Sequence, residues 1–447
     1  MLDKPFIVFQ YFFWPTMLSS QIELSFWENL AFTGPWDFVV VGAGVTGLHA
    51  AIEIKRQQPR FKVLILEARA LGTVASTRNA GFLCLGSPSE LQADLEKLGE
   101  SDLIELISAK WSGIQRTLNL LGGNAVGLRN VRGYEVFAKE YSRYSQAVSS
   151  HDSVVQDLPK LNQILAEAST KPIPYMSNRR RKGAMMQKPL PAPYFGDWKA
   201  FQGGLSAPSN PWGPEAAGLL PMAWEGQVNP FLLRESLLRY ARNLGIRIQE
   251  GLQVVQSDAQ NLTVRSDLSN KDDINNESSN ILNIKAKNII IATNALTKNL
   301  FHDQIAPIIP QRGQMWHSAA LRPVDLERLN GNYHADRGYI YYRTYQDRLL
   351  LGGGRNQDFN LEQTTEWSEN QLISDYLKSY SVDVLGLSPD LEWEFRWSGT
   401  MGFTESGLPQ CKDLQNGKWL VAGMNGMGMA LGPEMGRRVA CMALKAC

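Results

Sequence analysis

The stretch "DFVVVGAGVTGLHAAIEIKRQQPRFKVLILEAR", residues 37–69, decides the first folding unit of this chain. A short apolar, β-rich run comes first, as in a strand of a parallel sheet that is buried on both faces. Residues 45–58 then carry apolar side chains at helical spacing, a proline ends that pattern, and "FKVLILE" gives a second strand. The stretch therefore predicts a strand–helix–strand unit whose first turn contains Gly42, Gly44 and Gly47.

These glycines and one acidic residue have the arrangement of a dinucleotide site. Gly42 permits a tight turn, Gly44 lets the backbone approach a pyrophosphate, and Gly47 allows close packing of helix and strand. The N–H groups and the dipole of the helix N-terminus favour the pyrophosphate charge. Glu67 ends the second strand about 20 residues after the last glycine, where a carboxylate accepts ribose hydroxyls and repels a 2′-phosphate. The pattern disfavours NADP and leaves NAD and FAD open.

Composition limits the other classes of function. The chain has 447 residues, of which 44% are hydrophobic and 20% charged, with a net charge of +1. This length suggests two or three folding units, and the charge balance gives no reason to expect a nucleic-acid partner. The four cysteines and five histidines form no motif with metal-ligand spacing, so we expect no metal. Scattered cysteines and the lack of a segment long enough to cross a membrane predict a cytoplasmic protein without a transmembrane segment.

Residues 1–23 are interpreted as an N-terminal extension. Their apolar run from Phe6 to Leu18 is too short for a membrane span. Two interpretations remain open: translation begins at Met17, or the segment has a targeting or anchoring role.

Several further segments, read in order, resemble one known family. They are "VVVGAGVTGLHAA", "LILEAR", "ASTRNAGF", "GIRIQEGLQVV", "IIIATNA", "PQRGQMW", "WSGTMGFTESGLP" and "AGMNGMGMALGP". Together they are similar to the D-amino-acid oxidase (DAO) superfamily of FAD-dependent oxidoreductases, nearest its gamma-glutamylputrescine oxidoreductase and glycine oxidase-like branches. The resemblance runs from about residue 24 to 440 and leaves residues 170–220 unmatched. "LLLGGGRN" opens no helix and so is not a second dinucleotide site, which favours a flavin that the substrate reduces directly.

The resemblance implies a two-domain α/β (α+β) fold. A Rossmann-like FAD-binding domain would comprise residues 24–88, 225–310 and 395–447. A mainly antiparallel substrate domain would be inserted as residues 89–224 and 311–394, with 170–221 as a long excursion.

The resemblance also implies the residues that hold FAD. The loop at 75–81 would follow the isoalloxazine and pyrophosphate, and the turn at 423–429 would lie beside the flavin pyrimidine edge. "GTMGFT" lacks the cysteine that tethers flavin in sarcosine oxidases, and Cys411 lies beyond it, so FAD should be non-covalent. The complete set expected to contact the cofactor is Gly42, Gly44, Val45, Thr46, Gly47, Glu67, Ala68, Arg69, Ala75, Ser76, Thr77, Asn79, Ala80, Gly81, Val254, Thr293, Gly423, Asn425, Gly426, Met427, Gly428 and Met429.

Departures from the family pattern bear on the substrate. Met401 and Gly426 stand where the glycine oxidase branch has arginines that bind a substrate carboxylate, so an α-amino acid held in that manner is not expected. "WSGxMGFT" is closer to the gamma-glutamylputrescine oxidoreductase branch, which favours an amine. Arg312 and Arg355 are open to two interpretations, a surface salt bridge or a contact with a substrate acid.

The implied reaction oxidises a C–N bond of a small amine or amino acid by hydride transfer to flavin N5, after which the imine is hydrolysed. Such chemistry needs positioning and an apolar site more than a strong base. The predicted substrate-side residues are Tyr342, His317 and Met401, and Met315 is a further candidate. Because neighbouring residues of a strand face opposite ways, at most one of Tyr341 and Tyr342 lines the site.

Two other functions remain as alternatives: a flavoprotein dehydrogenase of a hydroxy acid or other non-amine substrate, and a non-catalytic FAD-binding protein. The electron acceptor, oxygen or a quinone, is left open, although the lack of a lysine in "RLLLGGGRN" favours dehydrogenase over oxidase activity.

Overall fold

The structure is a computed structural model. It describes residues 24–70, 74–140, 142–145, 151–171, 173–176, 182–185, 188–201, 212–258, 260–266, 281–299 and 307–445. The predicted N-terminal extension and much of the 170–221 excursion lie outside these residues. No helix among them has both the length and the apolar composition that a membrane span requires.

The opening stretch forms the centre of the first sheet. Strand β1 (Trp36–Val41) lies between β2 (Val63–Glu67) and β12 (Ile281–Ile291), and all three are parallel. The sheet continues on one side through β9 (Arg247–Glu250), and on the other β19 (Lys418–Ala422) runs parallel to the end of β12. Strands β10 (Leu252–Ser257), β11 (Asn261–Ser266) and β18 (Gln410–Asp413) complete it as antiparallel additions.

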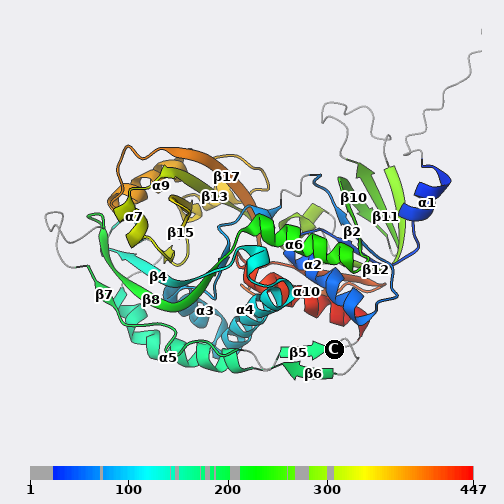
Figure 1. The fold of residues 1–447 in the computed structure, drawn as a ribbon, viewed down its shortest axis with the longest axis horizontal. Helices are drawn as coiled ribbons and strands as arrows, with labels where there is room; N and C mark the ends of the chain where they lie inside the picture. The colour runs from blue at the N-terminus through cyan, green and yellow to red at the C-terminus, as the bar shows by residue number, and fades with distance from the viewer. Residues whose placement is uncertain are drawn as a thin grey trace, which may run out of the picture.

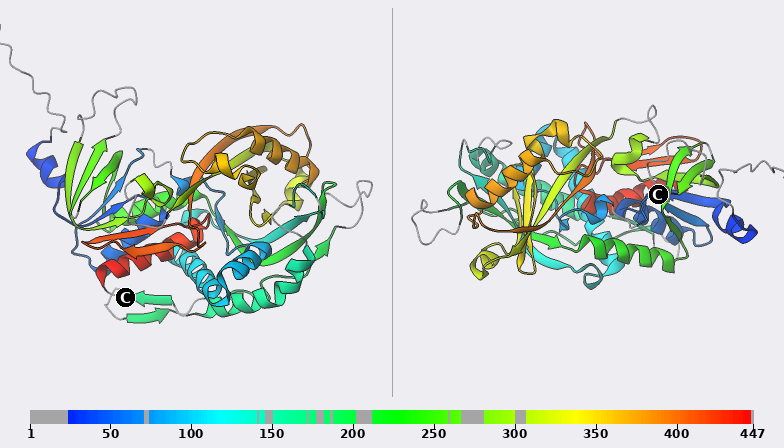
Figure 2. Two further views of the ribbon diagram at one scale, coloured as in Figure 1. Left: turned by 180° about the vertical axis from the view of Figure 1, so that it is seen from behind. Right: turned by 90° about the horizontal axis from the view of Figure 1, so that it is seen from above.

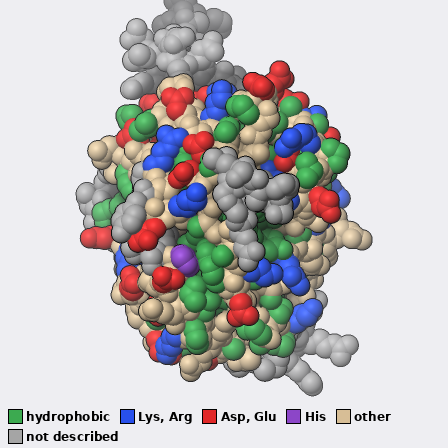
Figure 3. Space-filling model, turned by 90° about the vertical axis from the view of Figure 1, so that its left-hand side faces the viewer, with side chains coloured by type: hydrophobic (Ala, Val, Ile, Leu, Met, Phe, Trp, Pro, Cys, Tyr) green, Lys and Arg blue, Asp and Glu red, His purple; other side chains and the backbone are tan. Residues whose placement is uncertain are grey.

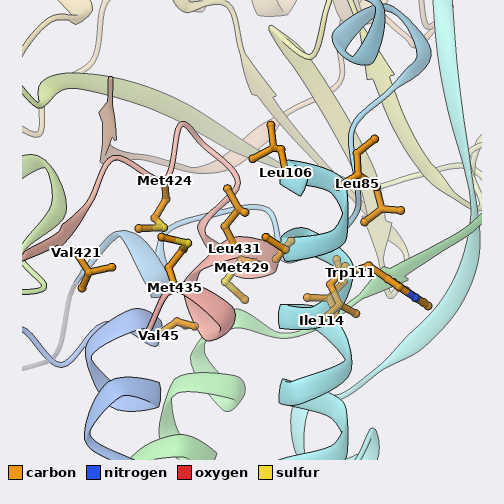
Figure 4. Packing of buried hydrophobic residues seen from close by; sticks show 14 of the residues in the cluster. Val45, Leu85, Leu106, Trp111, Ile114, Val421, Met424, Met429, Leu431 and Met435 are labelled. Carbon is orange, nitrogen blue, oxygen red and sulfur yellow. The ribbon is translucent and has the colours of Figure 1, made fainter. Parts of the chain in front are cut away.

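Helices α2 (Val45–Gln57), α4 (Glu100–Leu121), α6 (Pro230–Asn243) and α10 (Gly428–Leu444) accompany this sheet. Their apolar faces meet in one large core, to which Val45, Trp111 and Met435 all belong (Figure 4). Helix α10 crosses α2 so closely that a Cβ on Gly436 would lie 2.4 Å from the carbonyl oxygen of Thr46. This crossing fixes the start of α10 beside the start of α2.

The second sheet is mainly antiparallel and forms the other lobe of the molecule (Figures 1 and 2). Its order is β17 (Trp393–Phe403), β13 (Ile309–Ala320), β16 (Arg348–Gly353), β15 (Ile340–Tyr345), β14 (Asn332–Ala335), β4 (Arg129–Ala138), β8 (Ala216–Gln227) and β3 (Phe82–Leu83), with β7 (Lys199–Ala200) also beside β8. Among its described strands, β14 and β4 are the one pair that runs parallel. One face packs in a separate apolar core with residues of α9 (Gln371–Asp383).

The other described elements lie around these parts. They are α1 (Phe26–Phe32), α3 (Pro88–Leu98), α5 (His151–Thr170), α7 (Pro323–Arg328), α8 (Phe359–Glu362), the hairpin β5 (Ile173–Met176) and β6 (Lys182–Met185), and the 3₁₀ turns η1 (Ala75–Thr77), η2 (Asn124–Val126), η3 (Asn294–Asn299) and η4 (Arg355–Gln357). Acidic and basic side chains are interspersed over the coloured surface of the end formed by the second sheet (Figure 3).

The predicted two-sheet α/β (α+β) architecture is confirmed. The predicted domain boundaries, however, do not coincide with the sheets. Residues 82–83, 225–227 and 395–403 were assigned to the FAD-binding domain, yet they lie in strands of the second sheet. Helix α4, assigned to the substrate domain, packs against α10. The division into two domains therefore stays a proposal, and the domain boundaries predicted from the sequence fall a few residues away from the ends of the strands.

Candidate functional site

A cavity of about 440 Å³ opens at the carboxyl edge of the first sheet, between the starts of α2 and α10. Strands β1, β2 and β12 all end at it, because parallel strands present their carboxyl ends on one edge. Sixteen of the predicted site residues line it: Gly42, Gly44, Val45, Thr46, Glu67, Ala68, Arg69, Ala75, Ser76, Asn79, Val254, Thr293, Met401, Gly426, Gly428 and Met429.

The glycine turn has a distinct geometry at each position. Gly42 has φ +107°, and a Cβ there would lie 2.7 Å from the carbonyl oxygen of Ala292. A Cβ on Gly47 would lie 2.0 Å from the oxygen of Gly42, so this residue lies behind the cavity and allows α2 to approach β1. A Cβ on Gly44 would meet only the Ser76 hydroxyl, at 3.2 Å. The backbone of Gly44 is thus the part of the turn that a ligand can approach.

Polar groups at the turn are held in fixed positions. The Ala43 and Arg69 N–H groups donate to the two Glu67 carboxylate oxygens at 2.9 and 3.1 Å, which sets the carboxylate at the cavity edge. The buried Arg234 donates to the Ala43 carbonyl at 3.0 Å and so fixes the turn from behind. The Val45 N–H, in the first turn of α2, donates to the Ser76 hydroxyl at 3.0 Å. This helix end suits an anion, because its first N–H groups lack partners within the helix.

The segment before α9 adds a residue that the sequence analysis missed. Trp367 lines the cavity, and the guanidinium groups of Arg69 and Arg78 lie 3.9 and 4.2 Å from its ring centroid. Burial, and then the Arg69 charge, lower the pKa of Arg78. Two cations beside one indole place positive charge on the side of the cavity that faces the second sheet. An aromatic residue inside the polar run "EQTTEWSEN" was the available signal.

Two asparagines shape the turn between β19 and α10. The Asn294 side-chain oxygen accepts from the Gly423 N–H at 2.9 Å, and Asn294 itself lines the cavity, which was also not predicted. The Asn425 amide donates to the carbonyl of Gly407 at 2.8 Å, while its oxygen accepts from the Thr404 N–H at 2.8 Å. Asn425 therefore orients the turn from outside the cavity.

The remaining predicted contacts do not line the cavity. Besides Gly47 and Asn425 they are Thr77, Ala80, Gly81, Gly423 and Met427. Gly81, for example, lies against Val228, whose carbonyl oxygen would be 2.2 Å from an added Cβ. These residues support the loops that present the lining residues.

Two of the predicted substrate-side residues lie elsewhere. Tyr342 is fully buried in the core beneath α9, with its ring stacked on Tyr333 at 4.9 Å, so it does not reach the cavity. His317 lies six residues along β13 from Gln311, the partner of Met401, which is about 20 Å of strand. Its ring packs on Phe395, and burial lowers its pKa. Neither is kept as a candidate.

Tyr341 lies on the opposite face of the sheet from Tyr342, the face that carries Met401. A Cβ on Gly313 would lie 2.9 Å from Cε of Met401 and 3.3 Å from the Tyr341 hydroxyl, so these two side chains meet over that glycine. The Phe82 ring lies edge-on to Tyr341 at 6.4 Å. Met401 thus connects the cavity with an aromatic face of the second sheet.

A buried polar cluster lies next to this aromatic face. His334, across the β14–β15 pair from Tyr341, contacts the Glu225 carboxylate at 3.0 Å. Burial lowers the pKa of His334, but the charges of Glu225, Glu90 and Glu135 together more than offset this, and the pKa rises to about 9. Cys84 completes a set of potential metal ligands within 4.8 Å of one another. Because burial raises the pKa of the Cys84 thiol and the other two groups pair together, the absence of a metal stays our prediction.

Comparison with known proteins identifies the family. The family model "FAD dependent oxidoreductase" (DAO) matches residues 37–170 and 205–442, which is most of the chain. The chain belongs to the DAO family. It is therefore an FAD-dependent oxidoreductase, as the resemblance implied.

Individual relatives are distant. The probable oxidoreductase OrdL of Rhizobium meliloti is 22% identical over 415 residues, which cover 91% of this chain and 83% of OrdL. Glycine oxidase from Geobacillus kaustophilus matches at a TM-score of 0.62 with 18% identity, covering 92% of this chain and 95% of the enzyme. FAD-bound L-alpha-glycerophosphate oxidase from Mycoplasma pneumoniae matches at 0.60 with 13% identity, covering 92% and 94%. At these identities the structures establish the shared fold only.

Proposed function

We propose that this DAO-family protein oxidises a carbon–nitrogen bond of an amine or amino acid to an imine, which water then hydrolyses to a carbonyl compound and ammonia or a smaller amine. Bound FAD supplies the hydride acceptor, at its N5 atom. The observation that carries the proposal is the junction at Met401, where the dinucleotide cavity meets the aromatic face of Tyr341 and Phe82.

The cavity residues fit FAD. The open backbone of Gly44 and the start of α2 would take the pyrophosphate, and the Glu67 carboxylate would take the ribose. Val254 would meet the adenine. The turn of residues 423–429, which presents Gly426 and Gly428 to the cavity, would take the flavin edge. Cys411 does not line the cavity, and its sulfur contacts Met442, so we propose that FAD is held without a covalent bond.

The residues around Met401 provide an apolar environment for the substrate. Met315 is buried on the same face as Tyr341, and Gly352 beneath them leaves room for both side chains. Burial raises the pKa of Tyr341 to about 12, so its hydroxyl stays protonated at neutral pH and can donate a hydrogen bond. This lining excludes water and orients a neutral amine without supplying a strong base, which hydride transfer does not need.

Product analysis tests this proposal. The purified FAD-loaded protein is incubated with amines, amino acids and hydroxy acids in the presence of oxygen or a soluble quinone, and carbonyl products and released nitrogen are measured. We expect a carbonyl compound and ammonia, or a smaller amine, in equal amounts from an amine or amino acid. A keto acid formed from a hydroxy acid, with no nitrogen released from any compound, would contradict the proposal. The dependence on oxygen or quinone identifies the acceptor.

A further inference from the structure

Arg355 is a partly buried cation that forms no ion pair with an acid among the residues that the structure describes. It follows β16 and begins the short turn η4. Its guanidinium carbon lies 4.6 Å from the ring centroid of Tyr339 and 4.5 Å from that of Phe403. Within the described part of the chain the guanidinium makes no hydrogen bond or ion pair, so its five N–H donors remain available.

Arg312, the other arginine considered as a substrate contact, is fully engaged. Its guanidinium makes two hydrogen bonds to the buried Glu362 carboxylate, at 3.0 and 2.6 Å, and one to Ser368. It therefore fixes the segment that carries Trp367. Glu90 is an acid whose charge acts on Arg355, but its carboxylate accepts from the Ser87 N–H at 2.9 Å and faces His334 at 3.7 Å.

Arg355 does not itself line the cavity, but it lies against Phe403, whose ring is next to a residue that does. The Phe403 ring that it covers reaches to 3.7 Å from a Cβ built on Gly426, a cavity-lining residue. The sulfur of Met401 lies at the same distance from that Cβ. Met401 and Gly426 are the two positions where the glycine oxidase branch has arginines, by the sequence resemblance. Arg355 thus brings a guanidinium towards the same region from the turn that follows β16.

We infer that Arg355 binds the carboxylate of the substrate. Burial lowers the pKa of Arg355. An arginine side chain keeps its charge in proteins, and a desolvated cation is stabilised by an anion that accepts two of its N–H groups. The rings of Tyr339 and Phe403 hold the guanidinium plane, which favours a planar, two-oxygen ligand. The inference rests on the proposed function and narrows it: the preferred substrate is an amino acid or another amine that carries an acid, rather than a simple amine.

Binding of non-oxidisable acids tests the inference without turnover. Acetate and acetamide, which have the same shape and differ in charge, are titrated into the FAD-loaded protein, and binding is followed by the flavin absorption spectrum and by calorimetry. We expect acetate to bind about tenfold or more tightly than acetamide. Equal affinity for the two in the unmodified protein would overturn the inference, whatever the variants do.

Variants assign the effect to this side chain. Arg355→Gln should weaken acetate binding about tenfold or more, and Arg355→Lys should weaken it less, while acetamide binding stays unchanged in both. Arg396→Gln is the control, because Arg396 also lies over an aromatic ring, at 4.3 Å from Trp316, and is more exposed. FAD content and the melting temperature show whether each variant folds. A loss that is equal for acetate and acetamide would mean that Arg355 only supports the fold.

A second comparison separates this inference from the proposed function. Alanine and ethylamine, which differ by one carboxyl group, are mixed with the FAD-loaded protein without oxygen. Faster flavin reduction by alanine supports both the proposed amine oxidation and the binding of the substrate carboxylate by Arg355. Equal or faster reduction by ethylamine would leave the amine oxidation intact and overturn the role of Arg355. If neither reduces the flavin, the acetate titration still decides the inference.

Discussion

Gly44→Ala should separate FAD affinity from the stability of the fold. Gly44 has φ −76° and ψ 174°, which alanine adopts without strain, and the added methyl would meet only the Ser76 hydroxyl at 3.2 Å. The free energy of unfolding of the cofactor-free protein should therefore stay within about 0.5 kcal/mol or rise slightly, since alanine restricts the unfolded chain. In the FAD-bound protein the same methyl would occupy the space that the pyrophosphate approaches. Overpacking of this kind costs about 1–3 kcal/mol, which corresponds to a dissociation constant about 5- to 150-fold higher.

Equilibrium dialysis with FAD and thermal unfolding of the cofactor-free protein give the two quantities. Gly47→Ala is the matched comparison, because its methyl would lie 2.0 Å from the oxygen of Gly42 and must displace α2 or the turn. That variant should lose stability with or without FAD. If Gly44→Ala binds FAD as tightly as the unmodified protein, or unfolds as readily as Gly47→Ala, our assignment of Gly44 to the pyrophosphate is wrong.

Three further substitutions test other parts of the site. Glu67→Gln removes the negative charge of the carboxylate that we propose binds the ribose, and it should raise the FAD dissociation constant, measured by dialysis, about tenfold. An unchanged dissociation constant would refute this role of Glu67. Trp367→Ala should speed FAD dissociation several-fold to about tenfold in stopped-flow experiments. Trp367→Phe keeps an aromatic ring and should release FAD at close to the rate of the unmodified protein. Identical rates in all three proteins would contradict a role of Trp367 in holding FAD. Burial lowers the pKa of His334, but nearby carboxylates, chiefly Glu225, raise it from 6.5 to about 9, so its charge stabilises the fold fully below pH 6.5 and less as pH rises through 9. His334→Gln should therefore show a smaller fall in unfolding free energy between neutral pH and about pH 10, and parallel curves for the two proteins would argue against the ion pair.

The fold could be predicted because its signals are local. The apolar run before Gly42, the helical spacing after it and the next strand each depend on neighbours within a few residues, and β1, α2 and β2 follow them closely. The hairpin of β15 and β16 also has a local signal, because two alternating runs flank the two-residue turn at 346–347. Glu67 was identified because the spacing of the motif fixes it at the end of β2.

The errors at the site come from tertiary packing. Strand alternation shows that Tyr341 and Tyr342 face opposite ways, but not which face α9 covers, and the structure buries Tyr342 there. His317 shares a strand with the partner of Met401, yet the strand is long enough to carry it away from the cavity. Trp367 reaches the cavity through contacts with arginines about 300 residues earlier in the chain, which no local pattern reports.

Anaerobic reduction of the bound flavin tests the central claim most directly. The FAD-loaded protein is mixed without oxygen with a panel of amines, amino acids and hydroxy acids, and the long-wavelength absorbance of the oxidised flavin is followed. We predict that this absorbance is lost with an amine or amino acid and is retained with hydroxy acids. Loss with hydroxy acids alone, or a flavin that stays oxidised with every compound, would contradict the assignment of C–N bond oxidation to this protein.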